Sequence, residues 1–335
     1  MDGHGATVLG EDLLPASEDW NLRIQNQPVE VEDKPADHVS PFCGDDTGKP
    51  YAYHLHAMFK EELERMSKEL QHCAFCPWAC GVDRTKGERG VCGSGAGFGI
   101  GAIVEHHGEE PIFGGKHGIC NLFFSRCNLR CIYCQNYEIS RNRGPVVEHD
   151  LSLEEIVSRI EKVLARGVSH VGFVSPSHMI PQTRAIIAAL RRRGHAPTLV
   201  FNTGGYDLVE TLRGLEKEID VYLPDFKYMD NDLALQYSGA RDYPEVALAA
   251  IKEMVRQKGI SPEFDAQGSI RRGVVVRHLV LPGAVENSIA VLRTLAREIS
   301  PEIYISLMAQ YHPTPPVRTH PTLSRTITPE EYERV

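Results

Sequence analysis

Three cysteines in the segment SRCNLRCIYCQNYEIS, namely Cys127, Cys131 and Cys134, have the spacing Cys-x3-Cys-x2-Cys. Cysteine thiolates hold iron–sulfur clusters, and a cubane [4Fe–4S] cluster normally takes four of them. Three ligands leave one iron without a protein ligand, so that iron can bind a small molecule and pass it an electron. The spacing therefore predicts a reactive cluster, against the plainer alternatives of structural cysteines or part of a zinc site.

A second group of cysteines precedes the first and spans twenty residues: Cys73, Cys76, Cys80 and Cys92. Four thiolates make a complete metal site, which is typical of structural zinc or of a fully ligated [4Fe–4S] cluster. The spacing differs from the paired Cys-x2-Cys pattern of zinc ribbons. Both metals therefore stay open here. Of the two remaining cysteines, Cys43 is expected to be a free thiol and Cys120 a small buried side chain on a strand.

Apolar strand-like runs alternate with helix-like runs over most of the chain. The expected strands are 118–125, 170–175, 198–203, 220–225, 274–281 and 304–310. The expected helices are 51–71, 152–166, 182–193, 207–215, 231–237, 244–257 and 287–299, with Ser152 and Glu155 forming a capping box. Repeated strand–helix units predict a parallel sheet covered by helices. Six units are too few for a closed eight-stranded barrel, so we predict an α/β fold built as a partial (β/α)6 barrel.

Polar residues gather where the expected strands end. They are Ser175, Pro176, Ser177 and His178, then Asn202 and Thr203, then Asp225 and Lys227, then Arg277 and His278, and finally Gln310. In parallel α/β architectures the carboxyl ends of the strands build the site. The cysteines at 127–134 follow the first expected strand and so belong to the same rim. Two independent patterns therefore predict one site.

Composition and charge exclude several classes of protein. The chain has 335 residues and a net charge of −9, and residues 1–50 carry eleven acidic and three basic residues. The rest is nearly neutral, which gives nucleic-acid binding no support. No apolar run approaches the roughly 18 residues of a membrane span, and no secretory signal is visible. We therefore expect a cytoplasmic protein that binds neither membrane nor nucleic acid, in which the nine cysteines serve metals rather than disulfides.

Four regions are expected along the chain. An irregular acidic extension over 1–50 precedes a helix and a cysteine-rich metal-binding segment over 51–110. The catalytic core is expected over 111–318 and a tail over 319–335. The last residues, TPEEYERV, predict the beginning of a helix, so the tail is truncated if that helix continues beyond the chain.

The chain resembles radical S-adenosylmethionine (SAM) enzymes, in the branch of pyruvate formate-lyase activating enzyme and its PflX-type group. The residues that carry the resemblance are CAFCPWACGVDRTKGERGVCG (73–93), FFSRCNLRCIYCQNYEIS (123–140), FVSPSHMIPQ (173–182), VFNTGGYD (200–207), VYLPDFKYMD (221–230), VRHLVLPG (276–283) and ISLMAQYHP (305–313). They are in order and well spread from Cys73 to Pro313. The first seventy residues lie outside the resemblance.

The resemblance implies a catalytic cluster and its cofactor. Cys127, Cys131 and Cys134 would ligate three irons, and SAM would chelate the fourth. The reduced cluster would cleave SAM to methionine and a 5′-deoxyadenosyl radical, which abstracts a hydrogen atom from the substrate. A reductant protein such as flavodoxin or ferredoxin is implied as partner. The fold implied is the partial barrel of this superfamily, with the cysteine-rich segment before it.

The resemblance also suggests residues that contact SAM. Tyr133 stands at the position that lies near the adenine of SAM in relatives. The Gly-Gly-Glu motif that binds the SAM amino group in relatives is absent here, and Ser175 and Ser177, which stand in its place, become the candidates for that contact. The other candidates are Asn202 and Thr203 in the same pocket, Asp225 and Lys227 as an Asp-x-Lys motif for the charged tail, and His278 for the ribose. The plainer readings are a salt bridge for Asp225 with Lys227 and a core histidine for His278.

Three functions remain open at this point. The activase hypothesis has the radical abstract hydrogen from a glycine of a partner glycyl-radical enzyme, and the Asp225-x-Lys227 motif favours it. A second hypothesis has the radical act on a small molecule, lipid or peptide. A third, from another class, is a non-catalytic iron–sulfur protein for electron transfer or structure. The substrate itself is not predicted, because substrate contacts lie on variable loops.

Overall fold

The computed structural model describes residues 59–110, 112–114 and 117–335. The expected acidic extension, the first part of the helix expected over 51–71 and Cys43 lie outside the described residues. The strands are β1 (Ile100–His106), β2 (Ile119–Phe124), β3 (His170–Val174), β4 (Thr198–Thr203), β5 (Val221–Pro224), β6 (Glu263–Phe264), β7 (Ile270–Val274), β8 (Val276–Leu279) and β9 (Ile305–Met308).

The α-helices are α2 (Lys60–Leu70), α3 (Tyr137–Ser140), α4 (Leu153–Leu164), α5 (Ile180–Arg192), α6 (Val209–Leu215), α7 (Asn231–Ser238), α8 (Tyr243–Lys258), α9 (Val285–Glu298) and α10 (Pro329–Glu333). Short 3₁₀ turns are η1 (Arg84–Lys86), η3 (Pro176–His178) and η4 (Pro315–Val317). The expected capping box is present at the start of α4, where the Ser152 hydroxyl accepts from Glu155 N–H. No described helix is long and apolar enough to cross a bilayer.

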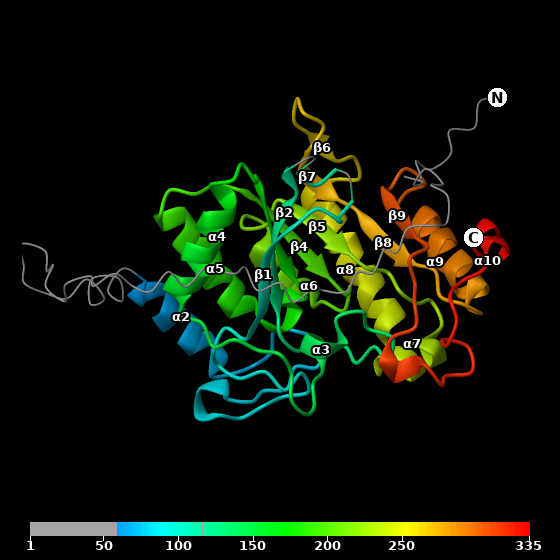
Figure 1. Ribbon diagram of the computed structural model, residues 1–335, viewed down its shortest axis with the longest axis horizontal. Helices are drawn as coiled ribbons and strands as arrows, with labels where there is room; N and C mark the ends of the chain where they lie inside the picture. Colours follow the sequence, from blue (N-terminus) through cyan, green and yellow to red (C-terminus); the bar gives the residue numbers. More distant parts are fainter. Residues whose placement is uncertain (1–58, 111, 115–116) are drawn as a thin grey trace, which may run out of the picture.

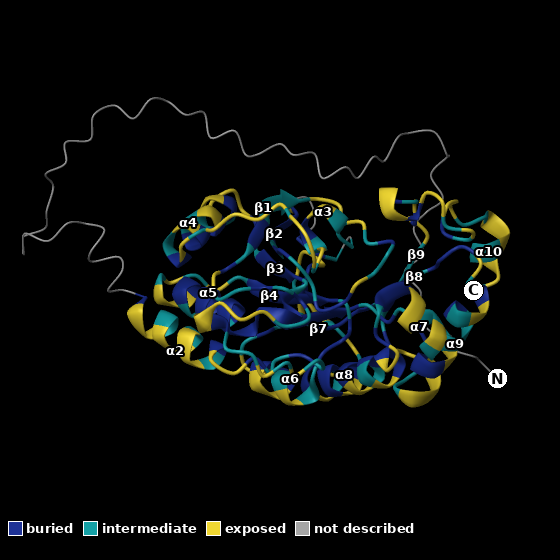
Figure 2. Ribbon diagram, turned by 90° about the horizontal axis from the view of Figure 1, so that it is seen from below, coloured by how far each residue is buried: buried dark blue, intermediate teal, exposed yellow. Residues whose placement is uncertain are grey.

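The sheet has the predicted parallel core. Strands β2, β3, β4 and β5 pair in parallel in chain order, β7 extends them beside β5, and β8 pairs in parallel with β9. A parallel bridge between Asp225 and Arg277 continues the pairing from β5 to β8. Within the described residues, six parallel strands therefore follow one another, if β7 and β8 count as one. Figure 2 shows these strands on a curve with α4, α5, α6, α8 and α9 outside it, which confirms the α/β partial barrel.

Two parts of the sheet differ from the strand prediction. The strand expected over 274–281 begins earlier, as β7 and β8 together run from Ile270 to Leu279. The strand β1 is not predicted, and it pairs antiparallel with β2 at the edge of the sheet. Its last residues, IVEH, mix polar and apolar side chains on a half-buried edge strand, so they lack the continuous apolar run of the buried strands.

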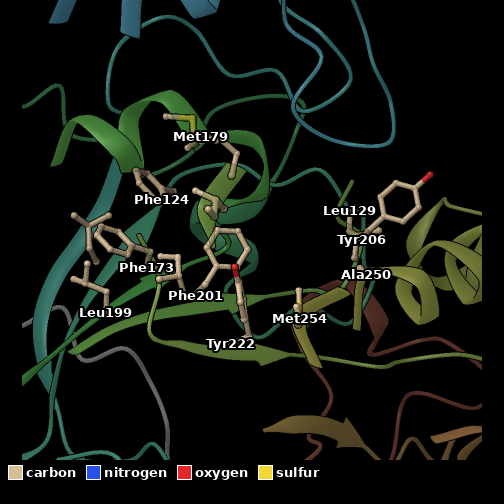
Figure 3. Close-up of a cluster of buried hydrophobic side chains, with 14 of the residues drawn as sticks. Phe124, Leu129, Phe173, Met179, Leu199, Phe201, Tyr206, Tyr222, Ala250 and Met254 are labelled. Atoms are coloured by element: carbon tan, nitrogen blue, oxygen red, sulfur yellow. The ribbon is translucent and has the colours of Figure 1, made fainter. Parts of the chain in front are cut away.

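Alternate residues of the parallel strands face the helices and the barrel interior. Phe173, Phe201 and Tyr222 are cross-strand neighbours in β3, β4 and β5, and they face the outer helices beside Met254 of α8 (Figure 3). The rings of Phe201 and Tyr222 are in contact, with 5.9 Å between their centroids. Burying such rings on the helical layer is the main source of cohesion in this half of the fold.

The loop after β1 closes the amino-terminal end of the barrel. Ile112 accepts a hydrogen bond from Ile270 N–H at 2.9 Å, and the Phe113 ring meets the His170 ring edge-on at 6.2 Å. Glu109 extends further inside, where it accepts from the Asn121 amide at 2.9 Å. The interior is therefore apolar at this end and becomes polar toward the carboxyl ends of the strands.

Candidate active site

The loop that carries Cys127, Cys131 and Cys134 leaves the carboxyl end of β2 and leads into α3. It is tied to the end of α7, because Arg130 N–H donates to Ser238 O at 3.0 Å and Ile132 N–H donates to Tyr237 O at 2.9 Å. The segment therefore has a defined path over the rim although it contains no long regular element.

Each of the three sulfur atoms has its own hydrogen-bond partner. Leu129 N–H donates to Cys127 Sγ at 3.5 Å, and the Ser140 hydroxyl donates to Cys134 Sγ at 3.2 Å. The Ser238 hydroxyl lies 3.0 Å from Cys131 Sγ. Donors aimed at sulfur stabilise thiolates and tune the potential of a cluster that they ligate. The donor set therefore fits an iron–sulfur cluster.

Burial raises the pKa of Cys127 to about 12, with a further contribution from Cys131. Burial also raises the pKa of Cys131, although the nearby Lys227 ammonium opposes the shift. Both thiols therefore keep their protons at neutral pH when no metal is bound. Ligation by iron would release these protons, because only the thiolate is a ligand.

A part-buried charged group lies beneath the cysteine loop, at the ends of β4, β5 and β8. Asp225 Oδ2 lies 2.5 Å from Lys227 Nζ, and Asp225 Oδ1 accepts from Arg277 Nε at 3.0 Å. Arg277 also donates to Asn202 Oδ1 at 2.9 Å and lies 3.5 Å from Glu109. Burial alone would raise the pKa of Asp225, but Lys227 and Arg277 hold it below its usual value. The carboxylate is therefore ionised between two cations.

A second polar group joins the ends of β3 and β4. The Ser177 and Thr203 hydroxyls are 2.9 Å apart, and the Thr203 hydroxyl donates to Asp207 Oδ2 at 2.6 Å. Burial raises the pKa of Asp207 to about 6, against the two hydroxyl hydrogen bonds, which lower it. Ser175 precedes this group with a left-handed φ of 56°, a strained conformation for a serine. Its N–H donates to Asn202 O at 2.8 Å, so the turn is fixed to β4.

Two predicted SAM contacts have other partners in the structure. His278 is 1% exposed, and its ring nitrogens lie 2.7 Å from Phe226 O and 2.8 Å from Ser288 Oγ. Burial lowers the pKa of His278 to about 4, so the ring is neutral. The Tyr133 hydroxyl lies 2.6 Å from the Tyr228 hydroxyl. Both side chains therefore have structural roles, and their contact with SAM stays a prediction.

Comparison with known proteins decides the family. Residues 121–296, just over half of the chain, match the family described as the radical SAM superfamily. The chain belongs to the radical SAM superfamily. A relative from Methanocaldococcus jannaschii, named "Uncharacterized protein MJ0674", is 25% identical over 281 residues, which cover 82% of this chain and 75% of the relative.

Several solved structures match the chain at low identity. The HydG maturase of the [FeFe]-hydrogenase matches with 15% identity and a TM-score of 0.44, over 64% of this chain and 48% of HydG. Streptococcus suis SuiB bound to S-adenosylmethionine matches with 13% identity and a TM-score of 0.42, over 61% and 41%. The protein anSMEcpe with bound AdoMet matches with 11% identity and a TM-score of 0.41, over 63% and 55%. This chain thus spans about half the length of those structures.

Membership of the radical SAM superfamily implies a [4Fe–4S] cluster and SAM. The structure gathers the predicted residues Asp225, Lys227 and Asn202 into one charged group, and Ser177 and Thr203 into the adjoining one. Three residues of these groups are not among the predicted site residues: Arg277, Asp207 and Glu109. Arg277 stands among the strand-end residues, but its sequence neighbourhood does not show which carboxylates it meets. The assignment of individual residues to SAM remains a prediction.

The second cysteine group lies beside the loop of the first. The loops of residues 73–99, coloured blue to cyan in Figure 1, lie at the same end of the molecule as α3. Trp78 Nε1 donates to Asn128 O at 2.7 Å, which joins the two cysteine segments directly. Cys73, Cys76 and Cys92 are buried. Among the described residues, no three His, Cys, Asp or Glu side chains are grouped so as to hold a metal ion.

Proposed function

We propose that this radical SAM protein cleaves SAM reductively at a [4Fe–4S] cluster on Cys127, Cys131 and Cys134. The bound cluster and SAM would together supply a 5′-deoxyadenosyl radical, which abstracts a hydrogen atom from the substrate. The observation that carries the proposal is the loop itself. Three cysteines, each with a hydrogen-bond partner at its sulfur, lie on the carboxyl rim of the barrel, over a part-buried group of opposite charges.

The charged group suits the polar tail of SAM, which has one ammonium and one carboxylate. Lys227 and Arg277 offer positive charge to the carboxylate, and Asp225 offers negative charge to the ammonium. Partial burial limits the competition of water for these charges, which strengthens each interaction. The half-buried Ser175 and the buried Ser177 and Thr203 border the same rim and add hydroxyl donors. These residues would orient the tail while the cysteine loop holds the cluster.

The test is formation of 5′-deoxyadenosine by the full chain after anaerobic reconstitution with iron and sulfide, in the presence of SAM and dithionite. We expect the wild type to form it and Cys131→Ala to lose it. Cys120→Ala is the matched control, because Cys120 is a buried cysteine within β2, outside the cysteine loop. This control should keep the activity. A fully loaded wild-type protein that forms no 5′-deoxyadenosine would favour the non-catalytic iron–sulfur alternative.

Within this reaction we propose an activase role, in which the radical takes hydrogen from a glycine of a partner glycyl-radical enzyme. The motif Asp225-x-Lys227 after β5 supports this proposal. The alternative substrate is a small molecule, lipid or peptide. The proposed setting is the cytoplasm, with flavodoxin or ferredoxin as reductant. A glycyl-radical signal in electron paramagnetic resonance (EPR) after mixing with a candidate partner would support activation. SAM-dependent conversion of a small molecule, with transfer of its hydrogen to 5′-deoxyadenosine, would contradict it.

We also propose a second metal centre on Cys73, Cys76, Cys80 and Cys92, either a [4Fe–4S] cluster or zinc. Its support is the donor set, four thiols within a single loop segment.

A further inference from the structure

Arg84 is a buried cation whose neighbours are sulfur atoms. It is 2% exposed and lies in the 3₁₀ turn η1, inside the second cysteine segment. Its guanidinium lies 3.6 Å from Cys92 Sγ and 3.8 Å from Met179 Sδ, and it also hydrogen-bonds the Cys73 side chain. Its Nε is buried without a hydrogen-bond partner. Among the ion pairs of the described residues, none pairs Arg84 with a carboxylate.

A buried guanidinium without a counter-charge costs free energy, because the ion loses its hydration without gaining an opposite charge. The groups in reach that can become negative are the cysteines. Thiolates that ligate a metal carry that charge, and a centre with four thiolates is anionic. The position of Arg84 is therefore explained if the neighbouring thiols are deprotonated by a bound metal.

The backbone around the four cysteines presents N–H donors to sulfur. Val91 N–H donates to Cys80 Sγ at 3.4 Å and Ser94 N–H donates to Cys92 Sγ at 3.5 Å. A Cβ on Gly90 would lie 2.7 Å from Cys80 Sγ, so only glycine lets the chain approach that sulfur. Such donors stabilise ligating thiolates. They are the same kind of contact that the three cysteines at 127–134 receive.

The geometry favours a cluster over a single ion. Zinc bonds of about 2.3 Å place tetrahedral sulfurs only about 3.8 Å apart. In a cubane each cysteine binds a different iron, so the ligand sulfurs stay farther apart. The four cysteines interact electrostatically with one another, yet no three of them are grouped to hold one ion. The same holds for the three cysteines at 127–134, which a cubane would span.

We propose that Cys73, Cys76, Cys80 and Cys92 ligate a second [4Fe–4S] cluster whose negative charge is balanced by Arg84. The proposal deepens the second metal centre proposed above and does not depend on SAM cleavage. The centre braces the loop of the first cluster at two points. One is the hydrogen bond from Trp78 to Asn128. The other is Asn142, whose side chain donates to Cys127 O at 3.1 Å. The backbone of Asn142 also passes close to Gly93, where a Cβ would lie 2.5 Å from Asn142 O.

The test uses the full chain with Cys127, Cys131 and Cys134 all replaced by alanine. After anaerobic reconstitution with ferrous iron and sulfide, we expect about four irons and four sulfides per chain in this variant and about eight of each in the wild type. The reduced variant should show an EPR signal from its cluster. An iron-free variant that keeps its circular dichroism, or one zinc per chain without iron uptake, would overturn the proposal.

A converse variant covers the case in which the triple variant does not fold. Replacing Cys76 and Cys80 by alanine in the wild type should lower the iron content from about eight to about four per chain. The yield of 5′-deoxyadenosine is measured separately in the wild type. If the proposed function is wrong, the wild type forms no 5′-deoxyadenosine. If this inference is wrong, the iron content of the wild type stays well below about eight irons per chain.

The role of Arg84 has its own readout, the midpoint potential of the second cluster in the triple variant. A nearby cation stabilises the more negative, reduced state, so Arg84→Gln should shift the potential to a more negative value. Arg84→Lys should restore most of it. Arg89→Gln is the matched control, because Arg89 is in the same segment but is exposed and donates to Gly93 O. An unchanged potential in Arg84→Gln would overturn the charge-balancing role.

Discussion

At the scale of single residues, the most consequential feature of this protein is the part-buried group of charges beneath the cysteine loop. The Asp225 carboxylate forms ion pairs with both Lys227 and Arg277. Arg277 also donates to Asn202 and forms an ion pair with Glu109. Such a group costs free energy to desolvate, so its value lies in orientation rather than in stability. Ion pairs and hydrogen bonds fix its charged side chains at the rim where the tail of SAM is proposed to bind.

Asp225→Asn should destabilise the protein, because it removes the shared counter-ion of the part-buried Lys227 and Arg277 and leaves Arg277 only its longer contacts with Glu109 and Glu110. We expect a loss of about 3 kcal/mol in the free energy of unfolding, measured by urea denaturation. Lys252→Met is the matched control, since Lys252 and Glu298 form an exposed pair. It should have a much smaller effect. Equal losses in the two variants would contradict the account of buried charge.

Asp207 should make the stability depend on pH. Its pKa is about 6 in the fold against 3.8 ordinarily, so between these values the folded chain keeps a proton that the unfolded chain releases. The stabilisation that Asp207 contributes is therefore complete below pH 3.8, and it is lost as the pH rises through about 6. Relative to Asp207→Asn, the wild type should lose about 3 kcal/mol between roughly pH 3.5 and pH 7 in denaturation experiments. A pH-independent difference would contradict this.

At the scale of elements, the turns after the strands decide where the side chains of the rim point. Gly205 follows β4 with a φ of 81°, and a Cβ there would lie 2.1 Å from Asp225 O. The turn from β4 to α6 thus passes directly against the end of β5. Close approach of the two backbones is what places Asp207 under Thr203 and Asp225 beside the same rim.

Gly205→Ala should cost about 3 kcal/mol or more, because it adds both a left-handed strain and a steric clash with backbone. Gly194→Ala is the matched control, since Gly194 has nearly the same φ, 82°, with nothing within 4 Å of a Cβ. The control should lose only about 1 kcal/mol. Thermal unfolding of both variants checks this, and similar losses would show that the clash is relieved by small shifts.

At the scale of the whole molecule, the cysteine-rich loops are joined to the barrel mainly at its carboxyl rim. Residues 71–99 contain only the short turn η1, so few backbone hydrogen bonds of regular elements hold them. Trp78 and Gln182 connect them to the cysteine loop and to α5, where Gln182 donates to Gly97 O at 3.1 Å. Metal binding would supply the remaining cohesion of this segment.

Reconstitution with iron and sulfide should therefore protect the segment from proteolysis. We expect trypsin cleavage after Lys86 and Arg89, both exposed, to slow by about tenfold, because the bound metal stabilises the closed loops. Cleavage after Arg318, an exposed residue in the carboxyl-terminal loops, should change little. Equal rates of cleavage at the cysteine segment with and without iron would contradict coupling between metal and fold.

The sequence by itself predicted the parallel strands, most of the helices and the candidate cluster cysteines. The apolar runs of β3, β4 and β5 are buried on both sides, so they stand out, and the cysteine spacing is a local pattern that survives without the fold. The tertiary structure alone decided which distant residues meet. Arg277 meets Asp225, Asn202 and Glu109 from three other segments, and His278 is turned to Ser288. The reason is that contacts between distant residues depend on strand register and loop path, which no local pattern encodes.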